Sequence, residues 1–545
     1  MHKASAFIKK CWGYGITVLL FAGCAQMIPP SGGPKDVTPP KVVEYIPENK
    51  STHFNKRKIL ITFDEYVQLK NLSTQFITSP PLKRVPQVLL RGKTMEITFT
   101  DTLANNTTYT FNFGNSISDN NEGNELKNFQ YVFSTGDFLD SLSLTGNIQD
   151  GLTHEPGKQA MVMLYADLSD SAPYKGPPSY VGLANDQGNY KIENIKVGTY
   201  RVISLSKSQG DYVYHPYGEE IGFAQKPIAM ISNDTINFLA FTETEPKLIM
   251  RKAKVIDKGE IGIVFNKPAD SIRIVPVNMA DRLGSTYNYL RYSATHDTLT
   301  YWTNNPFLDS LRFIVYRNNQ ILDTAFVHGF PGNLPIDKKK PRPTKIHFTS
   351  NTGAREGFDF HQPIVLQFDG PVLKHNFSKI HFGTKHDSLG FSVDTSGLPM
   401  SLSIKPIKPL ESDTVYTLQI LSGAFFDMYG GTNDTTVSHF GVLEPTYFGT
   451  LKLKVSFATQ GYFLVQLLDG NNIYRQKAVS GNTSIFFDAL PPGSYRVRVV
   501  QDDNNNSKWD AGDFMKGIQP EKVFYYNQAI TIRSNWDLAQ TWEVK

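Results

Sequence analysis

The sequence predicts an all-β protein that is a string of about five β-sandwich modules. Short runs of alternating apolar and polar residues recur along the 545 residues, whereas long stretches with helical spacing are hard to find. Gly and Pro, with 41 and 32 residues, interrupt these runs often enough to place turns between short strands. Two different sequence units each occur twice, and internal repeats of this kind indicate repeated domains. We therefore expect an extended rod.

The first repeated unit is a strand followed by an acidic turn. Its two copies are Ile59, Ile61 and Phe63 before Asp64, and Ile364, Leu366 and Phe368 before Asp369. A constant offset of 307 relates six further apolar positions, which run from Met95 to Phe113 and from Leu402 to Ile420. A weaker third copy contains Ile261, Ile263 and Phe265. We expect these segments to be equivalent strands that bury one face.

The second repeated unit is a Gly-containing turn that leads into an alternating strand. NIKVGTYRV around Tyr200 matches ALPPGSYRV around Tyr495 at an offset of 295. The two units alternate along the chain, with a divergent module between the first and second pairs.

The N-terminus is typical of a bacterial lipoprotein precursor. Three lysines precede an apolar run at 16–22 that leads to Gly23 and Cys24, and a run this short indicates a signal peptide rather than a spanning helix. We expect residues 1–23 to be removed and Cys24 to carry the lipid. Residues 24–39 are rich in Pro and Gly, as in a tether.

The cysteine count and the charge balance predict which bonds and partners the mature chain lacks. The two cysteines are Cys11, inside the signal peptide, and Cys24, so the mature chain has no pair for a disulfide. Without the signal, 52 basic residues stand against 51 acidic ones, and this balance predicts no nucleic-acid partner. No later segment approaches 18 consecutive apolar residues, so we expect no membrane-spanning helix beyond Cys24.

The segment CAQMIPPSGGPKDVTPP, followed by IPENK, ITFDEYV, TYTFNFGNSISDNNEGN and FSTGD, resembles a Bacteroidota lipoprotein family whose first domain is similar to the SbsA-type bacterial Ig-like fold. The GTYRV and GSYRV units resemble transthyretin-like, carboxypeptidase-regulatory β-sandwiches. These resemblances imply Ig-like modules at 40–137 and 343–443, a divergent Ig-like module at 246–335, and transthyretin-like modules at 141–243 and 446–545. Such folds serve adhesion, scaffolding and spacing alike, so they do not define an activity.

One loop, DNNNSKWDAGD, has the spacing of a calcium-binding loop. Oxygen-bearing side chains stand at positions 1, 3, 5, 9 and 12, with a backbone carbonyl at position 7: Asp502, Asn504, Asn506, Asp510, Asp513 and the carbonyl of Lys508. Ser507 replaces the usual turn glycine, and Asp513 reaches less far than the usual Glu. The candidate cofactor is Ca²⁺, and the alternative is an Asn/Asp-rich hairpin that caps its own backbone.

Ten sites have Asp followed by Ser or Thr and an aliphatic residue, which is similar to the O-glycosylation sequon of Bacteroidota periplasmic and surface proteins. The candidates are Thr102, Ser141, Ser171, Thr235, Ser271, Thr298, Ser310, Thr324, Ser388 and Thr414. An Asp in a turn that enters a strand produces the same pattern, and buried copies could not be modified.

No motif predicts an enzyme. The sequence contains no G-x-S-x-G, no H-E-x-x-H and no C-x-x-C. For Trp536 and Trp542 near the C-terminus, packing in the last sandwich is favoured over a platform for sugars.

Together these features favour a non-enzymatic, lipid-anchored outer-membrane subunit of an envelope protein complex. Its expected partners are the membrane lipid through Cys24 and outer-membrane β-barrel or other envelope proteins, including machinery that assembles or exports barrels and surface lipoproteins. The alternative is a carbohydrate-binding surface lipoprotein for polysaccharide uptake. Residues 25–30 contain no acidic residue, so periplasmic and cell-surface facing both stay open.

Overall fold

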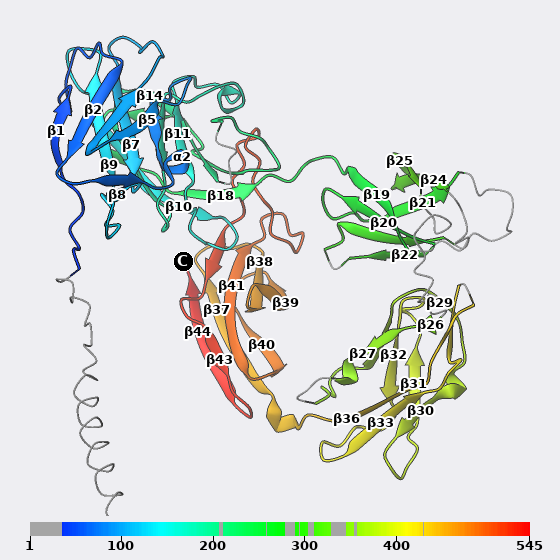
Figure 1. Cartoon of the computed structure of the whole chain (residues 1–545). Helices are drawn as coiled ribbons and strands as arrows, with labels where there is room; N and C mark the ends of the chain where they lie inside the picture. Colours follow the sequence, from blue (N-terminus) through cyan, green and yellow to red (C-terminus); the bar gives the residue numbers. More distant parts are fainter. Residues whose placement is uncertain are drawn as a thin grey trace, which may run out of the picture.

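The computed structural model describes residues 35–545, except 207–210, 258, 278–288, 294, 304–309, 329–344, 354–356 and 429. The predicted signal peptide and Cys24 lie outside the described residues. Regular structure is almost entirely β-strand (Figure 1), which confirms the predicted fold class. In the described ranges no helix has the length and apolar character needed to cross a membrane.

Module one packs two antiparallel sheets around one core. Its elements are β1 (Val42–Ile46), β2 (Lys58–Phe63), β3 (Val67–Leu69), α2 (Leu72–Gln75), β4 (Ile77–Ser79), β5 (Gln87–Arg91), β6 (Thr94–Thr98), β7 (Thr108–Gly114), β8 (Ile117–Asp119) and β9 (Phe129–Ser134). The sheet orders are β1-β2-β6-β5 and β4-β7-β9, and β3 pairs with β8. Alternate residues of β2 are buried between the sheets, as the sequence predicts.

Module four repeats this arrangement. Its elements are β26 (Lys345–Ile346), β27 (Phe348–Ser350), η2 (Asn351–Gly353), β28 (Ile364–Phe368), β29 (Val372–His375), η3 (Phe377–Lys379), β30 (Ile380–Gly383), β31 (Phe391–Asp394), β32 (Ser401–Pro406), β33 (Val415–Ile420), β34 (Phe425–Asp427), β35 (Thr432–Asn433) and β36 (Thr436–Gly441). The pair Leu366 and Leu402 in β28 and β32 corresponds to Ile61 and Met95 in β2 and β6. The duplication is therefore confirmed in strand register.

Modules two and five are the second pair. Module two contains β10 (Leu142–Asp150), β11 (Met161–Tyr165), η1 (Ala172–Tyr174), β12 (Tyr180–Leu183), β13 (Asn189–Ile195), β14 (Gly198–Ser206), β15 (Glu220–Phe223), β16 (Ile228–Met230), β17 (Asp234–Thr235) and β18 (Phe238–Thr242). Module five contains η4 (Pro445–Tyr447), β37 (Gly449–Phe457), β38 (Phe463–Asp469), β39 (Asn472–Val479), β40 (Thr483–Leu490), β41 (Gly493–Gln501), β42 (Val523–Tyr525), β43 (Ile530–Ile532) and β44 (Asp537–Val544). In each, the hydroxyl of the repeated tyrosine donates to the carbonyl four residues earlier, Tyr200 to Lys196 at 2.9 Å and Tyr495 to Pro491 at 3.0 Å.

Module three is a smaller pair of sheets. Its strands are β19 (Met250–Asp257), β20 (Glu260–Phe265), β21 (Ile272–Pro276), β22 (Tyr289–Tyr292), β23 (Thr298–Trp302), β24 (Ser310–Arg317) and β25 (Gln320–His328), in the orders β19-β20-β23-β22 and β21-β24-β25. The weak third copy of the repeated strand is β20, whose Ile261, Ile263 and Phe265 are buried.

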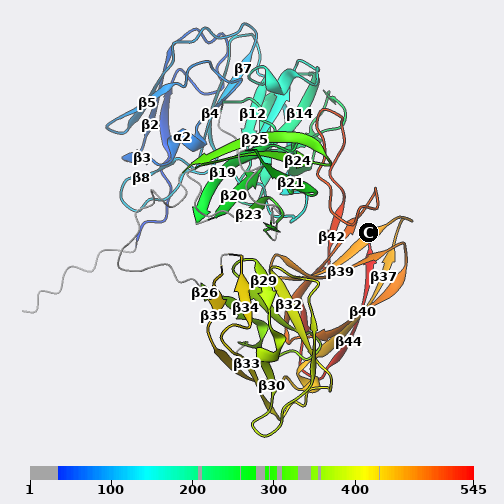
Figure 2. The ribbon, with the colours of Figure 1, turned by 90° about the vertical axis from the view of Figure 1, so that its right-hand side faces the viewer.

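The expected rod is wrong, because the chain folds back on itself. Residues 502–521, between β41 and β42 and here named the closure loop, lie on module two, and modules three and four form an arch between modules two and five (Figures 1 and 2). Modules one and two also touch, where the Val181 amide donates to Ser79 Oγ at 3.1 Å. The physical reason lies in β11, which buries all five of its residues. Because successive side chains of a strand point to opposite faces, both faces of the module-two sheet must pack against other parts of the chain.

Candidate functional site

The predicted calcium loop begins at Asp502, directly after β41. Asp502 is 1% exposed, and its two carboxylate oxygens accept the backbone N–H groups of Asn506 at 2.9 Å and Ser507 at 2.8 Å. Ser507 has φ of 63°, the left-handed conformation that glycine usually supplies at this point of a calcium loop. The loop therefore makes the sharp turn without the glycine, and the Asp502 carboxylate caps it.

Four of the five predicted side chains come together. The Asn504 and Asn506 amides both contact Asp510 Oδ2, at 2.5 and 2.6 Å, and Asn506 Oδ1 accepts the backbone N–H of Lys508 at 2.8 Å. Asp513 instead pairs with Lys516 Nζ at 2.7 Å. In the ranges that the structure describes, no group of three or more His, Cys, Asp or Glu side chains has a metal-binding arrangement. These contacts fit the self-capped hairpin, and Ca²⁺ stays a prediction.

Glu521 is a buried carboxylate that holds the two ends of this hairpin together. Its oxygens accept the backbone N–H groups of Asp503 and Asp510, each at 2.9 Å. Burial raises the pKa of Glu521, which these two hydrogen bonds oppose. Sequence reasoning missed this residue because it lies outside the calcium-loop spacing.

The closure loop inserts Phe514 into an apolar face of module two. Phe514 is 2% exposed, and its ring contacts those of Phe223, Tyr214 and Tyr174 at centroid distances of 5.2, 6.0 and 6.1 Å. This layer also contains residues from β11, β12, β14, β15 and β18, and Ile77 from module one. Side chains from three modules therefore share one apolar layer.

Polar contacts fix the orientation of the closure loop on module two. The Phe514 N–H donates to Glu243 Oε1 at 2.7 Å, and Tyr214 donates to Glu243 Oε2 at 2.6 Å. Burial, together with Glu243, raises the pKa of the Tyr214 phenol. At Gly512 a Cβ atom would lie 2.5 Å from Cζ of Phe241, so the close approach needs glycine.

A second, smaller layer lies on the side of module five. Trp509 and Leu152 pack over Leu464, Val500 and Val523. The Tyr525 hydroxyl donates to the Leu152 carbonyl across the two modules at 3.0 Å. The closure loop is thus sandwiched between the outer sheet faces of modules two and five.

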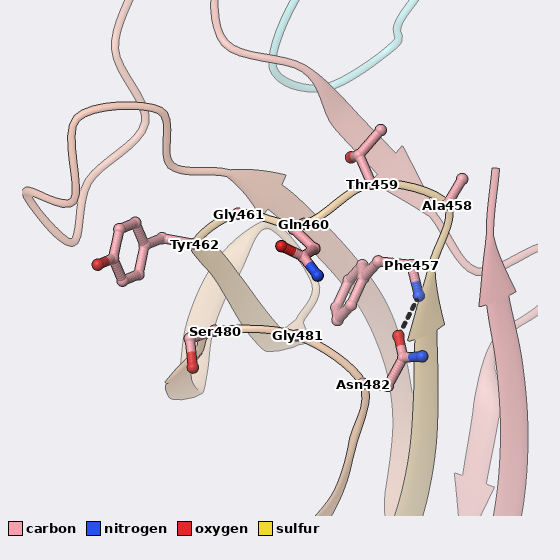
Figure 3. A pocket seen from close by; sticks show the side chains of 9 residues that line it. All are labelled: Phe457, Ala458, Thr459, Gln460, Gly461, Tyr462, Ser480, Gly481 and Asn482. Atoms are coloured by element: carbon pink, nitrogen blue, oxygen red, sulfur yellow. Dashed lines mark hydrogen bonds between the residues drawn. The ribbon is translucent and has the colours of Figure 1, made fainter.

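The structure contains an open pocket at one end of module five, shown in Figure 3. Its volume is about 750 Å³, and it is formed by the β37–β38 connection and the β39–β40 connection. The lining residues are Phe457, Ala458, Thr459, Gln460, Gly461, Tyr462, Ser480, Gly481 and Asn482. All of these side chains are neutral.

A second pocket, of about 500 Å³, lies where module two meets module three. Its charged groups already have partners: Glu245 Oε2 contacts Arg251 at 2.9 Å and Asn266 Nδ2 at 2.6 Å, and Lys267 Nζ donates to the Pro246 carbonyl at 3.0 Å. Burial lowers the pKa of Lys267. This arrangement fits a joint between modules.

None of the ten glycosylation candidates is buried. Four are partly covered, namely Ser171, Thr298, Ser310 and Thr414, and the exposed ones are Thr102, Ser141, Thr235, Ser271, Thr324 and Ser388. Burial therefore excludes none of the ten candidates, and glycosylation stays a prediction.

The C-terminal tryptophans do not form a platform. Trp542 packs on the core of module five and meets the ring of Tyr526 edge-on at 5.6 Å. Trp536 is 47% exposed and lies under the Arg533 guanidinium, 4.9 Å from the ring centroid. Core packing, the favoured interpretation, holds for Trp542.

Comparison with known proteins supports the Ig-like fold of the first module. The family model "Bacterial Ig-like domain" matches residues 36–135. A search of curated proteins finds no match.

Solved structures that match include BcpA, the major pilin subunit of Bacillus cereus, with 8% identity, TM-score 0.14, and coverage of 74% of this chain and 99% of that one. The N-terminal part of the bacterial S-layer protein SbsC has 16% identity, TM-score 0.14 and coverage of 38% and 44%. The Bacteroides ovatus mixed-linkage glucan utilization locus protein SGBP-B, in complex with a mixed-linkage heptasaccharide, has 9% identity, TM-score 0.17 and coverage of 72% and 94%. The strands of the structure and the family match together show a multi-module β protein in which residues 36–135 match a bacterial Ig-like domain.

Proposed function

We propose that this chain is a non-enzymatic accessory subunit of an envelope protein complex, held at the outer membrane by a lipid on Cys24. The Bacteroidota lipoprotein resemblance of the N-terminal sequence supports the anchor. The Ig-like domain and the absence of catalytic motifs in the sequence support a structural role rather than an enzymatic one.

The observation that carries the proposal is an exposed arginine and aromatic face on module three. On the outer face of the β21-β24-β25 sheet, Arg273 lies over the ring of Tyr316 at 4.2 Å, and Arg312 lies over that of Phe326 at 5.8 Å. Phe326 is 52% exposed. Arginine and aromatic side chains are enriched at the centres of protein interfaces. We name these four residues the module-three face and propose that a partner protein covers it.

The partners that fit a lipid-anchored subunit are proteins of the same membrane. We propose outer-membrane β-barrels, including machinery that assembles or exports barrels and surface lipoproteins. Purification of the tagged full chain in a gentle detergent tests this, because a stable partner should co-elute in a fixed ratio. A chain that always elutes alone and monomeric would contradict the accessory role.

A matched pair of variants locates the interface. Arg312→Glu with Phe326→Ala should abolish co-elution, because it removes the aromatic anchor and reverses the charge beside it. Module five has a comparable exposed pair on its outer sheet, Lys452 over Phe486 at 5.3 Å, so Lys452→Glu with Phe486→Ala is the control. Equal loss in both variants would show a general effect of surface charge and refute the module-three face.

The alternative function is carbohydrate binding for polysaccharide uptake. The tryptophans give no platform for it, but the neutral pocket at the end of module five does favour it. Periplasmic or surface facing is a separate question, and protease treatment of intact cells answers it: a surface protein is degraded, and a periplasmic one is protected.

A further inference from the structure

We infer that the pocket at the end of module five binds a neutral saccharide. Two loops form it, 458–462 and 480–482, which lie side by side at the end of the sandwich (Figure 3). Its volume of about 750 Å³ falls in the range of ligand sites, roughly 300–1,000 Å³.

Phe457 gives the pocket a fixed aromatic surface. Its ring stacks on that of Phe463 with a centroid distance of 3.8 Å and an interplanar angle of 5°. The Phe457 backbone N–H donates to Asn482 Oδ1 at 2.8 Å, which ties the backbone of Phe457 to the second loop. An aromatic ring held in this way offers a flat apolar surface to the C–H face of a sugar at little cost in conformational entropy.

The polar lining suits hydroxyl groups. Gln460 offers both an amide donor and an acceptor, whereas Asn482 keeps its NH₂ as a donor because Phe457 uses its oxygen. Ser480 and Thr459 add hydroxyls. Since no charged side chain lines the pocket, a phosphate or carboxylate would find no counter-charge there. The ligand class is therefore a neutral oligosaccharide.

Two glycines of the pocket lining have open space beside their Cα atoms. A Cβ atom at Gly481 would meet nothing within 4 Å, and at Gly461 it would meet only the Phe463 ring, at 3.8 Å. The backbone of both loops thus stays accessible to a ligand. This binding site does not depend on the accessory role proposed above, because its loops are far from the module-three face in sequence and lie in another module.

The test is binding of the full chain to an array of neutral oligosaccharides, namely β-glucan, α-glucan, xylan and mannan fragments, with uronate-containing and sulfated glycans beside them. Calorimetry with the strongest binder then gives the Kd. We expect binding of a neutral member and a Kd at least about tenfold weaker in Gln460→Ala, which removes the donor and the acceptor of the side-chain amide. Gln460→Trp, which fills the pocket, should show no measurable binding.

The control is Phe486→Ala, which removes an exposed phenylalanine from the outer face of the same module and should leave the Kd unchanged. Gln460 is exposed, so its variants should fold, and thermal melting checks this. Absence of neutral-glycan binding at millimolar concentration, preference for anionic glycans, or equal binding by Gln460→Trp would each overturn the inference. Co-elution with a membrane partner would be unaffected by any of these results.

Discussion

Replacing Phe514 by Ala should release the closure loop from module two. The Phe514 ring is 2% exposed and is surrounded by Phe223, Tyr214 and Tyr174. Truncating a buried Phe to Ala costs about 3–5 kcal/mol. The ring belongs to module five, and its surroundings belong to module two. That free energy therefore stabilises the contact between the two modules and contributes little to the core of either one.

Hydrogen exchange of the closure loop measures this effect. The backbone N–H at position 514 is bound to Glu243 in the closed form, so it exchanges only when the loop opens. At about 1.4 kcal/mol per factor of ten, the loss should speed exchange in residues 509–521 by more than about a hundredfold. Small-angle scattering should show a larger radius of gyration.

The matched control is again Phe486→Ala, whose side chain is 56% exposed and makes no contact with module two among its described interactions. It should exchange like the wild type. If Phe514→Ala folded and exchanged at the wild-type rate, the closure loop would be held by something other than the apolar layer around Phe514, and this prediction would be refuted.

Four further results are expected. Cys24→Ser should move the protein from the membrane fraction to the soluble fraction, and retention in the membrane would mean that the lipid is not what holds it. Burial raises the pKa of Asp119, but four backbone N–H groups that donate to its carboxylate together lower the pKa to about 2. Its contribution to stability is therefore present above about pH 4 and is lost as the pH falls towards 2; the difference in melting temperature between wild type and Asp119→Asn should shrink over that range, and a constant difference would contradict it. If the closure loop binds Ca²⁺, added Ca²⁺ should raise the melting temperature of the wild type but not of Asp510→Asn, whereas identical melts with Ca²⁺ and chelator would favour the self-capped hairpin. Glycopeptide mass spectrometry of protein from the native host should find modification at the exposed sequons before the half-buried ones, and unmodified peptides throughout would show that the Asp residues serve only as turn residues.

The strands could be predicted from the sequence because alternation of apolar and polar residues is visible within each short segment. The correspondence between modules could be predicted because the repeated segments are similar in sequence. The strand β2 and its copy β28 were predictable because each buries every second residue. The pairs Ile61 with Met95 and Leu366 with Leu402 show equal strand register in the two modules, although the offset is 305 residues at the first strand and 307 at the second.

The fold-back was harder to predict, because it depends on two surfaces more than 250 residues apart. A signal was present in β11, MVMLY, and in β38, FLVQLLD, which are apolar almost without alternation. Such runs indicate strands covered on both faces, and a sandwich alone covers one. The sequence does not indicate that Phe514 covers the outer face of the module-two sheet, because an aromatic residue in an Asp-rich loop also fits a solvent-exposed hairpin.

For the predicted calcium loop, the sequence identified the side chains that meet but not what they bind. Positions 1, 3, 5 and 9 of the loop do converge, but the convergence uses the same carboxylates and amides as a self-capped turn. Sequence spacing specifies which side chains meet, and not whether they meet around an ion or around backbone N–H groups.

The fold-back also changes how the chain would carry mechanical load. Module five follows modules three and four in the sequence, yet it contacts module two directly through Phe514, Gln519 and Tyr525. Tension applied to module five would therefore pass into module two and on to the N-terminal end without crossing the arch. Modules three and four would stay unstrained in their middle position, and a peptide bond cut within them would leave the last module still attached.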